Sequence, residues 1–340
     1  DGNLARRLSA FRDIYKLRET RNVGLAGLVV VVLLAATLLV WGQISRVAAL
    51  EEWQSVGQSL SRAISQNVSQ SLRTAELVLA SVGQEVDQAN IDAPAQLAEK
   101  LANKETFDTI RNRALVAPQV DVATIIDVDG NVINFTRQFP PPPINLADRD
   151  YFQALRSNTA LKSYLSVPVQ NRGTGTWTFY LARPIRSKSG AFLGVLLTGV
   201  HSSYYSDYFA SAAFSKAMSV SLFRTDGYLL ARYPVLEEYL GKSFVDRPVF
   251  KTLLLHGKSD QSMVTDESRL TSGSSAELRI MSPFSVSGYP LFINVTITGE
   301  HIFARWRATA IWVGATVVFL WAIILFLTHL AAKGLYSQSA

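Results

Sequence analysis

Two long apolar runs near the ends of the chain most constrain how it can fold. Residues 23–41 read VGLAGLVVVVLLAATLLVW, 19 positions without a charge, and residues 308–327 form an apolar run of 20. A helix rises about 1.5 Å per residue, so about 20 apolar residues cross the hydrocarbon core of a bilayer. The first run exceeds the apolar region of a cleaved signal peptide, and no small-x-small site follows it. The sequence therefore predicts membrane-spanning helices at residues 23–42 and 306–330.

The charges beside these runs indicate the orientation of the chain. Residues 1–22 carry six Lys and Arg against three acids, which favours a cytoplasmic N-terminal segment. Residues 43–305 then lie on the other side, and residues 331–340 begin a cytoplasmic linker. Arg305 and Arg307 flank the second run on its outer side and oppose this rule, so we expect them to reach lipid headgroups.

Charge and cysteine content exclude several classes of function. The net charge is +6, yet residues 43–304 hold 24 Lys and Arg against 24 Asp and Glu, so the excess lies beside the membrane and does not indicate nucleic acid. The chain has no cysteine, which excludes disulfides, thiolate catalysis and Cys-based metal sites. The four histidines are scattered, so we expect neither a metal nor a cofactor.

Residues 43–90 continue the first span as a polar-faced helix. Apolar residues recur every three or four positions there, from Leu50 to Val86, with Ser, Gln and Arg between them. A helix of this length packs along a whole domain or against a partner chain, and both interpretations stay open. A homodimer built on this stalk is therefore one prediction.

The segment after the stalk repeats itself. Residues 122–133 (VATIIDVDGNVI) and 220–230 (VSLFRTDGYLL) each predict a strand, a turn and a strand, with Gly130 and Gly227 separated by 97 positions. The DRDYF segment recurs as DRPVF at an offset of 98, with an Asp predicted at each helix N-terminus. The RPI and SPF strands follow at 99.

This ordered set of landmarks predicts two copies of an αβ unit, each with a central antiparallel sheet. We place the membrane-distal unit at residues 91–215 and the membrane-proximal unit at residues 216–305.

The order of these parts resembles the double Cache sensor domains of bacterial transmembrane receptors. The segments DRDYF (148–152) and GAFLGVLLTGV (190–200) carry the resemblance, which covers residues 45–305. It implies an α+β fold of two tandem PAS-like (Cache) units on the long helix, flanked by two transmembrane helices. It also implies the bacterial inner membrane, with residues 43–305 in the periplasm, and a ligand held in the distal unit between the sheet and its covering loops. Related receptors feed chemotaxis proteins, histidine kinases, and enzymes that make or degrade cyclic di-GMP.

The resemblance implies a first set of site residues. Amino-acid-binding members use an Arg-x-aromatic-aromatic element, and here Arg149, Tyr151 and Phe152 match it. A guanidinium suits a planar carboxylate because it can donate two parallel hydrogen bonds.

The second element of those members departs from the pattern. Val169 and Asn171 occupy the positions of a Tyr and an Asp that hold the ligand ammonium, and His201 replaces an Asp at the strand end. A buried ammonium without these carboxylates is poorly satisfied, so we expect a small anionic ligand, with Trp177 and Tyr180 as aromatic walls.

Architectural interpretations of the same residues stay open. Arg149 can instead pair with Asp148 or Asp150, and Trp177 can belong to the core. Arg247 repeats Arg149 in the second unit, which is expected of a structural residue. We also expect the strand face of His201 to have room beside Gly199, and the opposite face to lie on the long helix.

The second unit carries Asn294 and Thr296 in its last strand without a comparable aromatic cluster, so we expect it to couple and not to bind. Sequence motifs of catalysis such as GxSxG, HExxH, a P-loop or GGDEF are absent, so no enzyme is expected in these residues. Since only seven residues follow Lys333, an output domain of the parent protein is expected beyond them. The competing hypotheses are a periplasmic interaction or dimerisation scaffold and, third, a periplasmic hydrolase.

Overall fold

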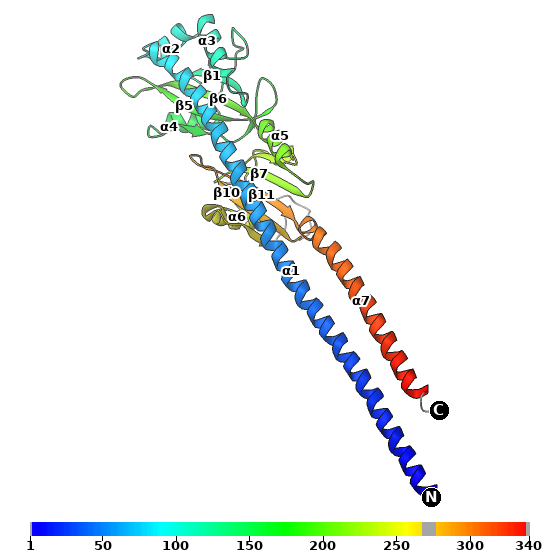
Figure 1. Cartoon of the computed structure of the whole chain (residues 1–340). Coiled ribbons are helices and arrows are strands. Elements are labelled where there is room, and N and C mark those ends of the chain that lie inside the picture. Colours follow the sequence, from blue (N-terminus) through cyan, green and yellow to red (C-terminus); the bar gives the residue numbers. More distant parts are fainter. Residues whose placement is uncertain (1, 267–276, 338–340) are drawn as a thin grey trace. The chain divides into compact units, whose positions relative to one another are not determined.

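The computed structural model describes residues 2–266 and 277–337. It divides into two compact units, Gln54–Gly299 and the paired segments Asp1–Trp53 and Glu300–Ala340, and each unit is described by itself (Figure 1). Helix α1 (Gly2–Gln88) contributes residues to both, because the first apolar run and the predicted stalk form one continuous helix.

The smaller unit pairs the start of α1 with α7 (Gly299–Ser337). Each helix holds an apolar stretch, with mean hydropathy 2.6 and 2.5, in which no side chain is buried by protein. Both are therefore candidate membrane spans, as predicted. Polar and aromatic contacts join the two helices, since Trp306 donates to the Ser45 hydroxyl at 2.9 Å and the Arg46 guanidinium lies 5.3 Å from the Phe303 ring centre.

The larger unit contains two antiparallel sheets with the same strand order. The distal sheet runs β2-β1-β6-β5-β3, with β4 also paired to β5, and the proximal sheet runs β8-β7-β11-β10-β9. The distal strands are β1 (Val120–Asp127), β2 (Val132–Phe135), β3 (Tyr164–Leu165), β4 (Val169–Gln170), β5 (Trp177–Arg186) and β6 (Phe192–His201). The proximal strands are β7 (Met218–Arg224), β8 (Leu229–Tyr233), β9 (Met263–Thr265), β10 (Arg279–Ser285) and β11 (Leu291–Thr298).

Short helices join and cover these strands. They are α2 (Pro94–Leu101), α3 (Lys104–Ala114), α4 (Asp150–Ser157), α5 (Ser202–Ala212), the 3₁₀ turn Glu237–Tyr239 and α6 (Pro248–Ser259). Helices α4 and α6 are the counterparts that the DRDYF and DRPVF segments predicted.

The register of the strands confirms the predicted repeat. Pro184 of β5 lies opposite Val195 of β6, and Pro283 of β10 lies opposite Asn294 of β11. The turns after β1 and β7 both place glycine in the left-handed region, with φ of 89° at Gly130 and 102° at Gly227. A side chain is strained in that conformation, so the two DG turns have the same physical cause.

One face of each sheet packs on α1, as Figure 1 shows. Helix positions three and four apart are buried, among them Val68, Leu72 and Leu79. Hydroxyls of α1 reach the proximal hairpin, where Ser65 donates to the Ser285 carbonyl at 2.6 Å. The face of β6 that carries Leu196 packs against α1, as the strand alternation predicted.

The other face of each sheet carries a separate core. In the distal unit this core includes Tyr151, Phe152 and Leu155 of α4. In the proximal unit it is built on phenylalanines 223, 244, 250 and 292, with ring centres 5.5–6.0 Å apart where they touch. The expectation that the second unit lacks an aromatic cluster was therefore wrong, because these phenylalanines are far apart in sequence and meet only in the fold.

Candidate ligand-binding site

Arg149 stands at the start of α4, and its two acidic neighbours are occupied elsewhere. Arg149 has extended backbone angles and precedes the first helical residue, Asp150. Asp150 accepts hydrogen bonds from the backbone N–H groups of Tyr151 and Val167, at 2.8 and 2.9 Å. Asp148 forms an ion pair with Arg172 at 2.6 Å and does not cap the helix as the sequence predicted.

The Arg149 guanidinium consequently keeps an unbalanced charge. Its one hydrogen bond in the part of the chain that the structure describes goes to the Gln170 carbonyl, at 3.4 Å. Over the same residues, none of the ion pairs involves Arg149. Pairing of Arg149 with Asp148 or Asp150, the architectural alternative, does not occur.

Arg149 lines a small cavity between the sheet and its covering loops. The cavity has a volume of about 40 Å³ and brings together three of the predicted residues, Arg149, Asn171 and Tyr180. Two further cations, Arg137 and Arg172, also line it. Its remaining wall is mostly apolar and comes from Val122, Thr124, Val132, Phe135, Ile144, Leu146, Gly173 and Leu197.

Asn171 organises the polar side of this cavity. Its side-chain N–H donates to the Tyr180 hydroxyl at 2.9 Å, and its Oδ1 accepts from Arg137 at 3.0 Å and from the Gly173 N–H at 2.8 Å. Burial raises the pKa of Tyr180 above its usual value, and the hydrogen bond with Asn171 only partly opposes this shift. Tyr180 is therefore a neutral hydroxyl at neutral pH.

Tyr151 and Phe152 support the site without opening into the cavity. Their side chains are 1% and 0% exposed and belong to the core under α4. The Tyr151 and Tyr180 rings lie 5.4 Å apart. A side chain at Gly199 would meet the Tyr180 ring at 2.9 Å, so the glycine lets the ring pack on the strand and does not leave free space. The aromatic pair after Arg149 thus anchors the helix that presents the guanidinium.

His201 binds a carboxylate of the protein itself. Its Nε2 lies 2.9 Å from Asp121 Oδ1, and Arg137 pairs with the other oxygen of Asp121. Burial alone would raise the pKa of Asp121, but the His201 hydrogen bond and the Arg137 charge outweigh it and leave the pKa below 3.8. The predicted contact between His201 and the cavity is not present, since the residue supports Arg137 from outside the lining.

Trp177 lies against the proximal core and not beside Tyr180. Its ring would be 3.2 Å from a side chain at Gly241. Successive strand residues face opposite sides of a sheet, and positions 177 and 180 differ by an odd number, so they cannot form two walls of one pocket.

The family model of the Cache domain, in its form dCache_1, matches residues 43–303. The chain belongs to the Cache family. A comparison with curated protein sequences finds no match.

Solved structures share the fold of this Cache chain at low sequence identity. The extracellular domain of rpHK1S-Z16, described as a candidate histidine kinase, has a TM-score of 0.61 and 24% identity over 75% of this chain and 98% of its own. The periplasmic sensory domain of the Campylobacter jejuni chemoreceptor Tlp1 gives 0.58 and 13% over 75% and 98%. The Pseudomonas fluorescens CtaA domain with L-isoleucine gives 0.52 and 18% over 77% and 98%.

Sequence reasoning missed Asp121, Arg137 and Arg172 in this Cache domain. Asp121 stands where β1 pairs with the end of β6, and Arg137 lies two residues after the end of β2. A charged residue close to the end of a mostly apolar strand was the available signal for both. Arg172 gave no such signal, because its place depends on how the loop between β4 and β5 folds back toward α4.

Proposed function

We propose that this Cache chain is the ligand-sensing input module of a two-pass receptor in the bacterial inner membrane. The distal unit binds a small carboxylate-bearing molecule at Arg149 and signals through the two spans to a cytoplasmic output, a histidine kinase or an enzyme of cyclic di-GMP turnover. The observation that carries the ligand proposal is the half-buried Arg149 guanidinium, which lines a cavity and has no carboxylate partner among the described residues.

The charges around the cavity favour an anion over a zwitterion. Of the three arginines that line it, Arg137 is balanced by Asp121 and Arg172 by Asp148, which leaves the charge of Arg149 for a ligand. A ligand ammonium would need Asp121, and that carboxylate is already shared by Arg137 and His201. The Pseudomonas fluorescens CtaA domain, which shares this fold, holds L-isoleucine, and a further solved structure, the ligand-binding domain of the Pseudomonas aeruginosa chemoreceptor PctB, holds L-Arg, so amino acids belong in the same test.

The size of the cavity implies that binding moves its cover. About 40 Å³ is far below the roughly 300–1,000 Å³ of small-molecule sites. The loop residues Ile144, Leu146 and Arg172 line one side and belong to no helix or strand. Displacement of this cover by a ligand supplies the conformational change that a sensor needs.

A chain of contacts leads from α4 to the proximal unit. Asp150, next to Arg149, holds the Val167 N–H at 2.9 Å and lies 4.0 Å from Arg224 of β7. Arg224 in turn donates to the Leu165 carbonyl at 2.7 Å. Movement of α4 is thereby linked to the proximal sheet, and the last strand of that sheet leads into α7.

Binding to the full chain in detergent micelles tests the proposal. Isothermal titration calorimetry with a panel of small mono- and dicarboxylates, and with amino acids, should find a ligand of the intact protein. Arg149→Ala should weaken its binding by about 10–100-fold, the value of one charge-assisted hydrogen-bonded contact. Arg156→Ala is the matched control, because Arg156 is exposed on the last turn of the same helix.

Three results would contradict the proposal. They are the absence of any binding across the panel, equal losses in the two variants, and a preference for amino acids that survives Asp121→Asn.

A further inference from the structure

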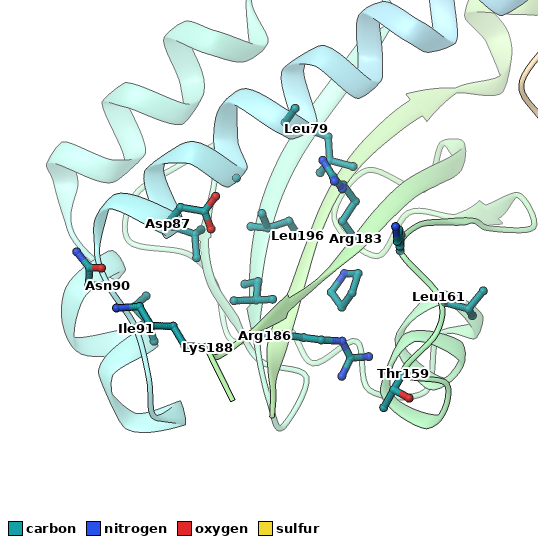
Figure 2. Close-up of a pocket in the computed structure, with 16 residues that line it drawn as sticks. Leu79, Asp87, Asn90, Ile91, Thr159, Leu161, Arg183, Arg186, Lys188 and Leu196 are labelled. Atoms are coloured by element: carbon teal, nitrogen blue, oxygen red, sulfur yellow. The ribbon is translucent and has the colours of Figure 1, made fainter. Parts of the chain in front are cut away.

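A second hollow lies on the opposite face of the distal sheet, between α1 and the strands β5 and β6 (Figure 2). Its volume is about 570 Å³, within the usual range of small-molecule sites. It shares no lining residue with the cavity at Arg149. Strand alternation separates the middle of the two sites, because Arg183 lies opposite Leu196 and faces α1, whereas Tyr180 and Leu197 face α4. Arg186 reaches the hollow from the end of β5, where the register with β6 shifts.

The lining of this hollow is strongly cationic. Lys162, Arg183, Arg186 and Lys188 line it, against the single acid Asp87. In the described part of the chain none of these four cations takes part in an ion pair. Four cations that share one hollow repel one another, so the free protein holds a positive potential there that an anion would relieve.

The four cations differ in how firmly the protein holds them. Arg186 is fixed, since it donates to the Leu155 carbonyl at 3.0 Å and lies 5.8 Å from the Phe192 ring centre. The side chains of Arg183 and Lys188 are exposed and make no hydrogen bond or ion pair to the described residues. Figure 2 shows them around one space, with Asp87 on the side of α1. Arg186 is thus held in place, whereas the side chains of Arg183 and Lys188 can reorient to bind an anionic group at the rim of the hollow.

The floor of the hollow is apolar and formed by signalling elements. Leu79, Gly83 and Val86 come from α1, and Ile185 and Leu196 come from the sheet. Gly83 faces Leu196 across this floor, since a Cβ added at Gly83 would lie 3.6 Å from that leucine, an ordinary contact distance. A ligand here would touch both the sheet and the helix that continues into the first candidate span.

We propose that this hollow is a second ligand site, which binds a small molecule carrying two or more phosphate or carboxylate groups. A singly charged ion would leave most of the four cations unpaired, whereas a polyanion neutralises several at once. A bound ligand would contact β5, β6 and α1 together, on the face of the distal sheet opposite Arg149. The two sites are therefore independent, and this proposal does not rest on the ligand proposed for Arg149.

Calorimetric titration of the full chain in detergent, at roughly 0.15 M salt to screen weak surface binding, tests the second site. The probes are pyrophosphate and citrate. The double variant Arg183→Glu/Lys188→Glu should weaken binding of at least one probe by about tenfold or more, since it removes two cationic contacts and places two carboxylates at the same positions. Lys216→Glu/Lys251→Glu is the matched control, because it makes the same change of net charge at exposed positions outside the hollow.

The outcomes separate the two sites. Retention of binding in the control pair and in Arg149→Ala, with loss in Arg183→Glu/Lys188→Glu, would support the second site. Equal losses in both double variants would show nonspecific attraction and overturn it. Loss in Arg149→Ala alone would move the probe to the first cavity, overturning the second site while leaving the proposed function standing. Failure of both probes to bind at millimolar concentration would also overturn it. Faster or slower hydrogen exchange at residues 79–91 on binding gives a second readout.

Discussion

The distal and proximal units have one strand order and one hairpin register but opposite interiors. Below α4 the distal sheet leaves a cavity with the polar side chains of Arg149, Asn171 and Tyr180 on its wall. Below α6, among the described residues, the proximal sheet carries an aromatic core in which Phe223, Phe250 and Phe292 are in mutual contact. The backbone of a duplicated unit therefore does not decide how one face of its sheet is filled. Side-chain volume on one sheet face does.

The distal and proximal units also differ at one equivalent position, which is an arginine in both. Arg149 and Arg247 follow an Asp at the same point of each unit, yet Arg149 is half-buried on a cavity wall and Arg247 is exposed. Repetition in sequence suggested a shared architectural role for both. Their different surroundings instead separate a candidate binding residue from a surface residue.

The largest loss of stability is expected from a substitution in the aromatic core of the proximal sheet. Phe223→Ala removes a buried ring in contact with Phe244, Phe250 and Phe292 and should cost about 3–5 kcal/mol. For a unit of this size the melting temperature should fall by roughly 6–20 °C, measured by tryptophan fluorescence of the full chain. Leu255→Ala, at a position 68% exposed on α6, is the control. Similar shifts in both variants would show that the proximal face is not a packed core.

Acid stability should depend on Asp121 in the distal unit. Because the folded-state pKa of Asp121 lies below 3.8, its ionised form stabilises the fold above that pH, and the stabilisation is lost as pH falls through the folded pKa. Asp121→Asn should therefore cost about 1–3 kcal/mol at pH 7 and progressively less below roughly pH 4. Thermal melts between pH 3 and 7 measure this. If the loss of unfolding free energy in Asp121→Asn stays constant with pH, or if the exposed Asp246→Asn loses as much, then ionised Asp121 does not stabilise the fold.

The link between the two units predicts a local effect at Arg224. Arg224→Met removes the hydrogen bond to the Leu165 carbonyl while keeping much of the side-chain volume. Hydrogen exchange at residues 164–170 should quicken by about 5–30-fold, corresponding to about 1–2 kcal/mol of lost local stability. The exposed Lys251→Met on α6 should leave these amides unchanged. Unaltered exchange in Arg224→Met would mean that Arg224 does not couple the units.

The smallest change in stability and in ligand affinity is expected for substitution of Arg247. Arg247→Ala should change stability by less than about 0.5 kcal/mol and leave the affinity for any ligand that depends on Arg149 unaltered, because Arg247 is exposed. Titration of Arg149→Ala and Arg247→Ala side by side checks the contrast. A ligand lost equally in both variants would show that the repeated arginine matters as architecture in each unit.

The candidate site could be predicted only in part. Arg149, Asn171 and Tyr180 were inferred from the sequence and lie together on the cavity wall. Trp177 was misplaced because three residues along a strand reverse the face. His201 was assigned to a ligand because its partner, Asp121, is 80 residues away in sequence and becomes a neighbour only when β1 pairs with β6.

Local and periodic properties of the sequence alone determined the candidate spans, the long amphipathic helix, the two DG turns and the repetition of the αβ unit. Each depends on residues near one another in the chain, where hydrophobicity, helix period and backbone preference act directly. The tertiary structure decided where the cavity at Arg149 lies, which carboxylates are already occupied, and where unpaired cations gather beside α1. Those properties depend on side-chain volumes and charges from distant segments meeting at one sheet face.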